Sequence, residues 1–131
     1  HGLMVPVIKD AEQKSIYTLA QTISEIIVKG KNGKLTVDEV QGGTFTLNNT
    51  GALGSVASQP LINPPQAAIL TTEAIIKRPV VIKDNIEIRS MMNITLTFDH
   101  RIMDGHEAGA FITDLKNRLE LLGSTTQIDS S

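Results

Sequence analysis

The sequence predicts an α/β or α+β domain in which helices pack against one mixed β-sheet. Amphipathic helical patterns occupy residues 16–30 and the region from Gly105 to Leu122. Other short apolar segments are bounded by turn residues, which is typical of strands. The chain of 131 residues is long enough for one domain with a buried core. Strands and helices in this order are typical of layered folds.

Residues 3–8 form an apolar run that predicts the first strand. Apolar side chains on both faces indicate a central strand, whereas Pro6 favours an unpaired position or an edge. The first helix follows, with Ser15 as its predicted N-cap and Gly30 at its end. Its apolar stripe predicts one buried face and consists of Ile16, Leu19, Ala20, Ile23, Ile26 and Ile27.

The middle of the chain begins with a capping-box pattern, Thr36-Val37-Asp38-Glu39, which predicts a short helical turn. Gly42-Gly43 is expected to end this turn, and residues 44–47 predict a short strand. The segment 48–65 is rich in Gly, Ser, Asn and Pro, so we expect a loop. A loop of this length is commonly a functional one.

Four further strands are predicted, at residues 67–77, 80–83, 86–89 and 91–98. Asp84-Asn85 is the expected two-residue turn of a hairpin between the middle pair. These segments supply most of the predicted mixed sheet.

The second helix is expected to begin near Gly105 and to end at Gly123. Its apolar face consists of Ala108, Phe111, Ile112, Leu115, Leu119 and Leu122. The polar residues 124–131 predict a flexible tail. The expected organisation is therefore one domain portion over residues 1–123, followed by this tail.

Composition narrows the possible functions. The formal net charge is −2 at pH 7, which gives no reason to expect a nucleic acid or an anionic membrane as partner. The chain contains no cysteine, so a disulfide, a thiolate nucleophile or a cysteine-based metal site is excluded, and we expect no metal. No apolar run has the length of a membrane span.

The most informative segment is Asp99-His100-Arg101-Ile102-Met103-Asp104-Gly105, at the junction between the last predicted strand and the last helix. Such a junction can hold a side chain rigidly beside a cleft. The imidazole of His100 can transfer a proton near neutral pH. Asp104 is a candidate N-cap for the helix, and Asp99 and Arg101 are expected to form a local ion pair or an interface contact.

The His-x-x-x-Asp-Gly pattern after Phe98-Asp99 resembles the catalytic domain of the dihydrolipoyl acyltransferases, the core components of 2-oxo acid dehydrogenase complexes. Chloramphenicol acetyltransferases share the pattern, and peptide-synthetase condensation domains have a second histidine where this chain has Asp99. The likeness extends over three further blocks, Gly2 to Lys9, Gly42 to Leu47 and Ile62 to Leu70.

This resemblance implies the chloramphenicol-acetyltransferase-like fold, a two-layer mixed sheet with helices on one face. It implies a homotrimer that shares its active sites across subunit interfaces and that can build a 24-mer or larger core. It also implies that the chain is the C-terminal portion of the catalytic domain. The first half of that domain, and the lipoyl and partner-binding domains, are then expected upstream or on a separate piece of a cleaved chain.

The resemblance also implies roles for individual residues. His100 would be the base that takes the proton of a thiol, and Asp104 would support the active-site geometry, which is compatible with capping. The family usually has Ser or Thr where this chain has Asn48, and that hydroxyl donates to the oxyanion of the tetrahedral intermediate. We expect the amide of Asn48 to replace it, with a simple turn-forming role as the alternative. Positions close to coenzyme A match Asn48, Asn49, Glu73 and Ile75.

The implied reaction is acyl transfer between dihydrolipoamide, carried on a separate lipoyl domain, and coenzyme A. Similarity to bacterial enzymes favours a branched-chain acyl group. Expected partners are further copies of the chain and the decarboxylase and dihydrolipoamide dehydrogenase components, in the cytoplasm or in a mitochondrial matrix. Two alternatives stay open, a non-catalytic assembly core and a free acetyltransferase of the chloramphenicol type.

Overall fold

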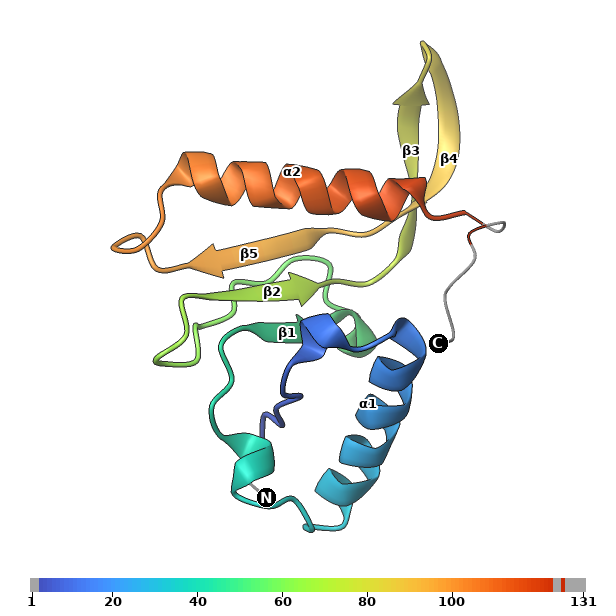
Figure 1. Cartoon of the computed structure of the whole chain (residues 1–131). Helices are drawn as coiled ribbons and strands as arrows, with labels where there is room; N and C mark the ends of the chain where they lie inside the picture. Colours follow the sequence, from blue (N-terminus) through green and yellow to red (C-terminus); the bar gives the residue numbers. More distant parts are fainter. Residues whose placement is uncertain (1–2, 124–125, 127–131) are drawn as a thin grey trace. The chain divides into compact units, whose positions relative to one another are not determined.

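A computed structural model describes residues 3–123 and Thr126 (Figure 1). The chain divides into two compact units, residues 1–43 with 117–131 and residues 44–116. The elements in order are η1 (Ala11–Gln13), α1 (Ile16–Lys31), η2 (Asp38–Val40), β1 (Thr46–Asn49), η3 (Gly51–Leu53), β2 (Ala68–Thr72), β3 (Ile76–Ile82), β4 (Asn85–Met91), β5 (Ile94–Phe98) and α2 (Gly105–Leu121).

Helix α1 is the main element of the first unit. The hydroxyl of Ser15 accepts a hydrogen bond from the Thr18 N–H at 3.1 Å, so the predicted N-cap is confirmed. The helix ends at Lys31, one residue after the predicted end. Along the predicted apolar stripe only Ile26 is buried, and Ile16, Ile23 and Ile27 are exposed.

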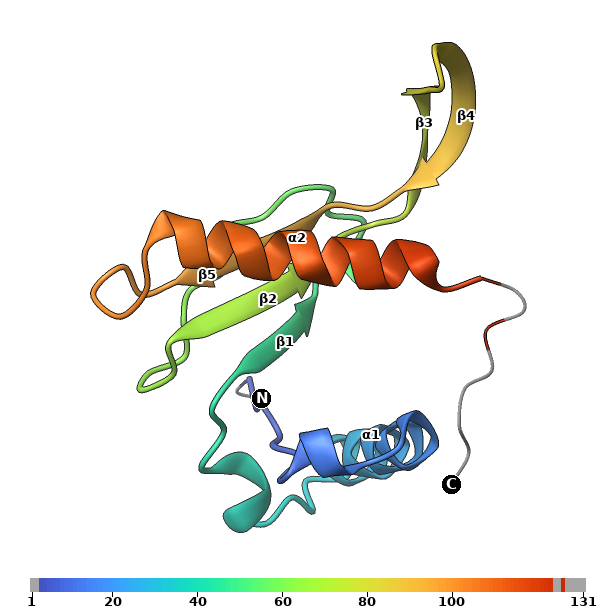
Figure 2. The ribbon, with the colours of Figure 1, turned by 45° about the horizontal axis from the view of Figure 1, so that its top comes forward.

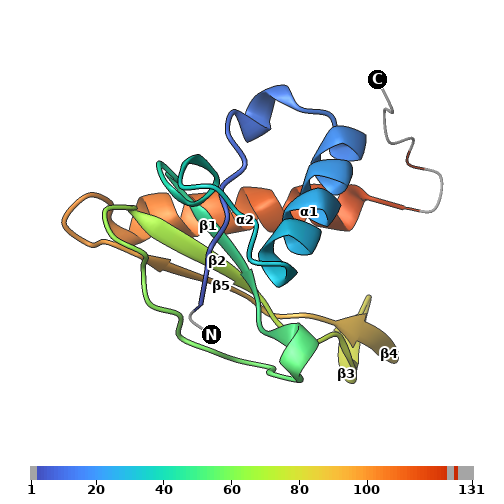
Figure 3. The same ribbon diagram turned by 90° about the horizontal axis from the view of Figure 1, so that it is seen from below.

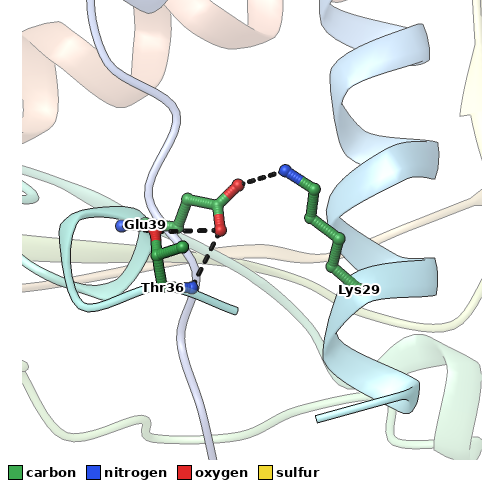
Figure 4. Close-up of polar contacts among 3 residues, drawn as sticks. All are labelled: Lys29, Thr36 and Glu39. Atoms are coloured by element: carbon green, nitrogen blue, oxygen red, sulfur yellow. Dashed lines mark hydrogen bonds and ion pairs between the residues drawn. The ribbon is translucent and has the colours of Figure 1, made fainter. Parts of the chain in front are cut away.

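The short turn η2 is held by the predicted capping box (Figure 4). The Thr36 N–H donates to Glu39 Oε2 at 2.9 Å, and the Glu39 N–H donates to the Thr36 hydroxyl at 3.3 Å. Lys29 donates to Glu39 Oε1 at 2.5 Å and joins the turn to α1. This hydrogen bond, followed by the one from the Thr36 backbone, lowers the pKa of Glu39 to about 2, and Glu39 raises the pKa of Lys29.

The prediction of a strand at residues 3–8 is wrong, because these residues form no regular element in the structure. The Val7 N–H donates to the Glu39 carbonyl at 2.7 Å, and Pro6 has no N–H to donate. The side chain of Leu3 is 95% exposed. A strand needs a neighbouring strand to accept its ladder of hydrogen bonds, and the described part of the chain provides none for this segment.

The second unit contains a three-stranded mixed sheet in the order β1-β2-β5 (Figure 3). Strand β1 is parallel to β2, with Thr46 opposite Ile69, and β2 is antiparallel to β5, with Leu70 opposite Leu96. The central strand β2 is buried from Ala68 to Thr71, as its continuous run of small and apolar residues requires. The mixed sheet is therefore confirmed.

Residues 105–116 of α2 cover one face of this sheet (Figures 1 and 3). Ala108 is buried, and the ring of Phe111 lies 6.2 Å from that of Phe45, centroid to centroid. A tilted aromatic pair of this kind contributes about 0.5–1.5 kcal/mol beyond its buried area. The helix is fixed over the part of the sheet where β5 ends.

Several predicted strand limits are wrong. Strand β1 covers 46–49 instead of 44–47, so Asn48 and Asn49 lie in a strand and not at the start of a loop. The predicted strand 67–77 divides at residues 73–75, and the predicted strand 91–98 divides at residues 92–93. The chain leaves the three-stranded sheet at the first break and returns to it at the second, and the residues between form a separate hairpin, which an apolar run does not reveal.

The hairpin consists of β3 and β4. It forms a second sheet, whereas the sequence predicted a single sheet. It extends away from the three-stranded sheet (Figure 2). Its turn consists of Lys83 and Asp84, one residue earlier than predicted. Both have positive φ, 46° and 64°, which a two-residue hairpin turn of type I′ requires. Pro79 is paired opposite Ile88, which is tolerated because β3 is an edge strand.

Helix α2 ends at Leu121, two residues before the predicted Gly123. The predicted tail 124–131 lies outside the described residues apart from Thr126, whose N–H donates to the Gly123 carbonyl at 3.0 Å. Among the described residues, no helix has the length and apolarity needed to cross a membrane.

Candidate active site

Asn48 lies in β1 at the point where it pairs with Thr71 of β2. Its amide nitrogen donates to the Thr71 hydroxyl at 3.5 Å, and its backbone carbonyl accepts from the Thr72 hydroxyl at 3.4 Å. Its side chain is half-buried, on the side of the strand that also holds buried Thr46. The strand therefore gives this amide a defined direction.

Asn49 ends β1 and begins the following turn. Its side-chain oxygen accepts a hydrogen bond from the Ala52 N–H at 3.2 Å. This bond joins η3 to the end of β1. Asn49 is exposed, so it is accessible to a ligand. Asn49 thus forms a turn contact, whereas Asn48, for which a turn-forming role was the alternative, forms a side-chain hydrogen bond within the sheet.

Glu73 follows β2 and is the charged residue that the structure buries most deeply, with 2% of its surface exposed. Ser58 donates to Oε1 at 2.5 Å and Thr50 donates to Oε2 at 2.6 Å. These bonds, that of Ser58 first, lower the pKa of Glu73. The predicted coenzyme A position Glu73 is therefore turned inward, whereas Ile75, two residues on, is 69% exposed.

Gly51 allows the chain to pass directly against the backbone of Glu73. A Cβ added at Gly51 would stand 2.3 Å from the backbone carbon of Glu73. We expect Gly51→Ala to destabilise the protein by about 1–3 kcal/mol, because the neighbouring backbone must shift. Thermal and urea unfolding of the full-length protein measure this effect.

Gly109→Ala is the matched control for that prediction. A Cβ at Gly109 meets nothing within 4 Å, and the residue lies inside α2. Alanine in a helix interior is expected to stabilise the protein by about 0.5–1 kcal/mol. Equal effects of the two substitutions would contradict the close approach at Gly51.

His100 follows β5 by two residues, in the turn before α2. The imidazole is exposed and lies against the ring of Phe98, with centroids 5.3 Å apart and an interplanar angle of 45°. The ring is therefore supported on one side and open to solvent, so a second molecule can reach it.

The turn around His100 is closed by its two neighbours. Arg101 Nε donates to Asp99 Oδ1 at 2.9 Å, and its Nη2 donates to Oδ2 at 2.6 Å. The backbone N–H of Arg101 also donates to Asp99 Oδ1, at 3.0 Å. The predicted local ion pair is confirmed. The side-chain hydrogen bond from Arg101, followed by its backbone hydrogen bond, lowers the pKa of Asp99 to about 2.

This shift predicts a pH dependence of stability. The folded-state pKa of Asp99 lies below the unfolded value of about 3.9, so the stabilisation is complete above that pH and is lost as the pH falls through about 2. We expect Asp99→Asn to lower the melting temperature of the full-length protein at neutral pH. The difference from wild type should shrink between about pH 4 and pH 2. A difference that stays constant over this range would contradict the assignment.

Asp104 caps α2. Its Oδ1 accepts from the His106 N–H at 2.9 Å and from the Glu107 N–H at 3.0 Å, and its own N–H donates to Glu107 Oε2 at 3.2 Å. The predicted N-cap is confirmed, and it is a complete capping box. Glu107 was missed in the sequence, although Asp-x-x-Glu at a helix start is the signal for it.

The candidate residues do not meet within one chain. Asn48 is in register with Thr71, which pairs with Thr95 of β5. His100 stands five residues further along the chain than Thr95, beyond the far end of the strand. At about 3.3 Å per residue, the two lie more than about 10 Å apart along the sheet. Asn48 and Asn49 are at one end of the sheet, and His100 and Asp104 are at the other.

A cavity of about 320 Å³ lies between the sheet and the start of α2. Its lining is apolar except for Glu107, and it consists of Phe45, Ala67, Ala68, Leu96, Ile102, Met103, Glu107 and Phe111. The turn after His100 contributes Ile102 and Met103 to this lining. In the described part of the chain, no cluster of three or more His, Cys, Asp or Glu side chains could hold a metal ion.

Comparison with known proteins identifies the class of protein to which this fold and site belong. Residues 1–126 match the family described as 2-oxoacid dehydrogenases acyltransferase (catalytic domain). The chain belongs to this family, whose members are transferases.

Its relatives differ in the acyl group that their names specify. The lipoamide acyltransferase component of the branched-chain α-keto acid dehydrogenase complex of Bacillus subtilis (strain 168) is 49% identical over 128 residues, which is 97% of this chain and 30% of that protein. The dihydrolipoyllysine-residue succinyltransferase of Buchnera aphidicola is 48% identical, over 91% of this chain and 29% of that protein. The dihydrolipoyllysine-residue acetyltransferase component of the pyruvate dehydrogenase complex of Corynebacterium glutamicum is 46% identical, over 91% of this chain and 18% of that protein. The chain thus spans less than a third of the length of these relatives.

Solved structures show the same fold. A probable dihydrolipoamide acetyltransferase from Listeria monocytogenes 4b F2365 matches with a TM-score of 0.93 and 49% identity, over 98% of this chain and 56% of that one. The dihydrolipoamide acetyltransferase of Azotobacter vinelandii matches with a TM-score of 0.86 and 36% identity, over 90% of this chain and 49% of that one. The latter structure was determined to examine the roles of a serine, a histidine and an asparagine in the catalytic mechanism.

Proposed function

We propose that this chain is part of a dihydrolipoyl acyltransferase that transfers an acyl group between dihydrolipoamide and coenzyme A in a 2-oxo acid dehydrogenase complex. The observation that supports this most directly is the arrangement of His100 and Asp104 at the start of α2. The imidazole is exposed and ring-supported, and the capping box holds the helix start that follows it.

Residue spacing supports the same assignment. His100 lies 52 residues after Asn48 and four before Asp104. The serine, histidine and asparagine numbered in the Azotobacter structure stand at the same two spacings. The family match covers both segments. We therefore infer that Asn48 takes the place of that serine and that Asp104 takes the place of that asparagine.

The proposed mechanism uses His100 as general base. It takes the proton of the coenzyme A thiol, and the resulting thiolate attacks the carbonyl carbon of the acyl-dihydrolipoamide thioester. The amide N–H of Asn48 donates to the oxyanion that forms. The intermediate collapses by breaking the bond to the dihydrolipoamide sulfur, which receives the proton from His100. A free thiol is only a few per cent thiolate near neutral pH, so a base at this position produces the nucleophile when it is needed.

Because Asn48 and His100 lie at opposite ends of one sheet, we propose that each active site combines Asn48 of one copy with His100 of another. A threefold trimer satisfies this arrangement, since a head-to-tail contact repeated around an axis closes into a ring. A structural relative forms the cubic core of the pyruvate dehydrogenase multienzyme complex, which supports assembly of such trimers into a larger core. The decarboxylase and dihydrolipoamide dehydrogenase components are the proposed further partners, in a bacterial cytoplasm or a mitochondrial matrix.

We further propose a branched-chain acyl group and a coenzyme A site that includes the exposed residues Asn49 and Ile75. The test is an acyl-CoA panel on the full-length protein, in which acetyl, isobutyryl, isovaleryl and succinyl donors are compared in transfer to dihydrolipoamide. We expect the highest kcat/KM for isobutyryl and isovaleryl. Preference for acetyl or succinyl would contradict only the branched-chain assignment. Absence of transfer from all four would contradict the proposed function.

A further inference from the structure

The buried carboxylate of Glu73 is bonded to the segment that directly follows the candidate oxyanion donor. Its two oxygens accept from Ser58 at 2.5 Å and from Thr50 at 2.6 Å. Both hydroxyl groups belong to residues 50–58, which begin where β1 ends. Hydrogen bonds to a charged acceptor such as this carboxylate are stronger and more directional than hydrogen bonds to a neutral acceptor.

Hydrogen bonds to backbone carbonyl groups hold the same segment at further points. The Thr50 N–H donates to the Thr72 carbonyl at 3.1 Å, and the Ala74 N–H donates to the Ser55 carbonyl at 2.7 Å. The Asn93 amide donates to the Val56 carbonyl at 2.7 Å. Together with the close passage of Gly51, these contacts close residues 50–58 over Glu73.

These bonds reach the candidate site through adjacent residues. Thr50 follows Asn49 directly, and Asn49 is joined to Ala52 of the same segment. The carbonyl of Asn48 accepts from Thr72, the residue before Glu73. A displacement of residues 50–58 therefore also displaces the end of β1, where Asn48 and Asn49 lie.

We infer that Glu73 is a positioning residue for acyl transfer, and that its carboxylate, through Thr50 and Ser58, fixes the end of β1 so that the Asn48 amide points at the developing oxyanion. This inference rests on the proposed function and assigns the Glu73 side chain a role separate from contact with coenzyme A. The lowered pKa of Glu73 keeps the carboxylate ionised, and so accepting only, at neutral pH. Oxyanion donors act through fixed geometry, and small displacements of such groups cost large factors in rate.

Thr50→Val and Thr50→Ser test this inference in the full-length protein. Valine keeps the shape of threonine and removes the donor to Glu73, whereas serine keeps the donor. At saturating acyl-CoA we expect kcat to fall about tenfold for Thr50→Val and to stay within about twofold of wild type for Thr50→Ser. Equal loss in both variants would overturn the inference.

A double-mutant cycle with Asn48→Ala separates positioning from general loss of stability. If Thr50 acts through Asn48, Thr50→Val should change kcat by less than about twofold once the Asn48 amide is removed. Independent, multiplicative effects of the two substitutions would overturn the inference. Should Thr50→Val fail to fold, Ser58→Ala removes the other donor and completes the same cycle.

Thr46→Val is the matched control. Thr46 lies in the same strand and donates its hydroxyl to Gln66 at 2.5 Å, away from Glu73. We expect it to lower the melting temperature and leave kcat unchanged. A loss of kcat equal to that of Thr50→Val at equal melting temperature would overturn the inference. If the proposed function itself is wrong, the result is different: the wild-type protein catalyses no acyl transfer.

Discussion

Replacing His100 by alanine in the full-length protein is expected to lower kcat for acyl transfer by about 10²–10⁴-fold. The imidazole of His100 is the proposed acceptor of the thiol proton, because an imidazole can act as a base near neutral pH. It is exposed and contacts Phe98, so the truncation leaves the core intact and the melting temperature nearly unchanged. Steady-state transfer from acyl-CoA to dihydrolipoamide, with thermal unfolding of the same samples, measures both quantities.

His106→Ala is the control for this experiment. His106 lies in the first turn of α2, where its backbone N–H, which alanine retains, donates to Asp104. We expect wild-type kcat for this variant. Undiminished transfer by His100→Ala would exclude the general-base role and would favour the non-catalytic assembly core.

Replacing Asn48 by alanine is expected to lower kcat by about 10²–10³-fold, the usual cost of losing one oxyanion donor. Asn48→Ser should retain most of the activity, because the serine hydroxyl can also donate a hydrogen bond to the oxyanion. Asn117→Ala, on an exposed position of α2, is the control and should not change kcat. If Asn48→Ala is as active as wild type, the amide is not the donor.

The same two variants test whether the site is shared between copies. When His100→Ala and Asn48→Ala chains are assembled together at random, about one quarter of the shared sites contain both intact residues. We therefore expect co-assembled trimers to regain about one quarter of wild-type activity. If both residues acted within one chain, no mixed trimer would contain an intact site and activity would stay at the level of the single variants.

Local features of this chain were predictable from the sequence because their causes are local. Ser15, the Thr36–Glu39 capping box and Asp104 each satisfy backbone N–H groups a few residues away, so their residue types reveal them. The ion pair around His100 is equally local, since Asp99 and Arg101 are two residues apart. The candidate base was found by the same means, as part of a short motif.

Features that depend on distant neighbours were predicted poorly. The apolar residues 3–8 have the composition of a strand, yet no described strand pairs with them. The predicted strand 67–77 divides where the Ala74 N–H donates to the Ser55 carbonyl and not to a neighbouring strand, which no periodicity within 67–77 expresses. The inward direction of the Glu73 carboxylate is likewise invisible without the loop that supplies its donors.

The sequence alone therefore determined the N-caps of the two helices, the ion pair around His100 and the identity of the candidate base, since neighbouring residues in the chain decide these. The tertiary structure decided that Asn48 and His100 stand at opposite ends of one sheet and that Glu73 lies beneath residues 50–58. Those facts depend on strand order and register, which join segments more than twenty residues apart. Such pairings arise from burial and hydrogen bonding between distant segments, and a linear pattern does not encode the position of its neighbour.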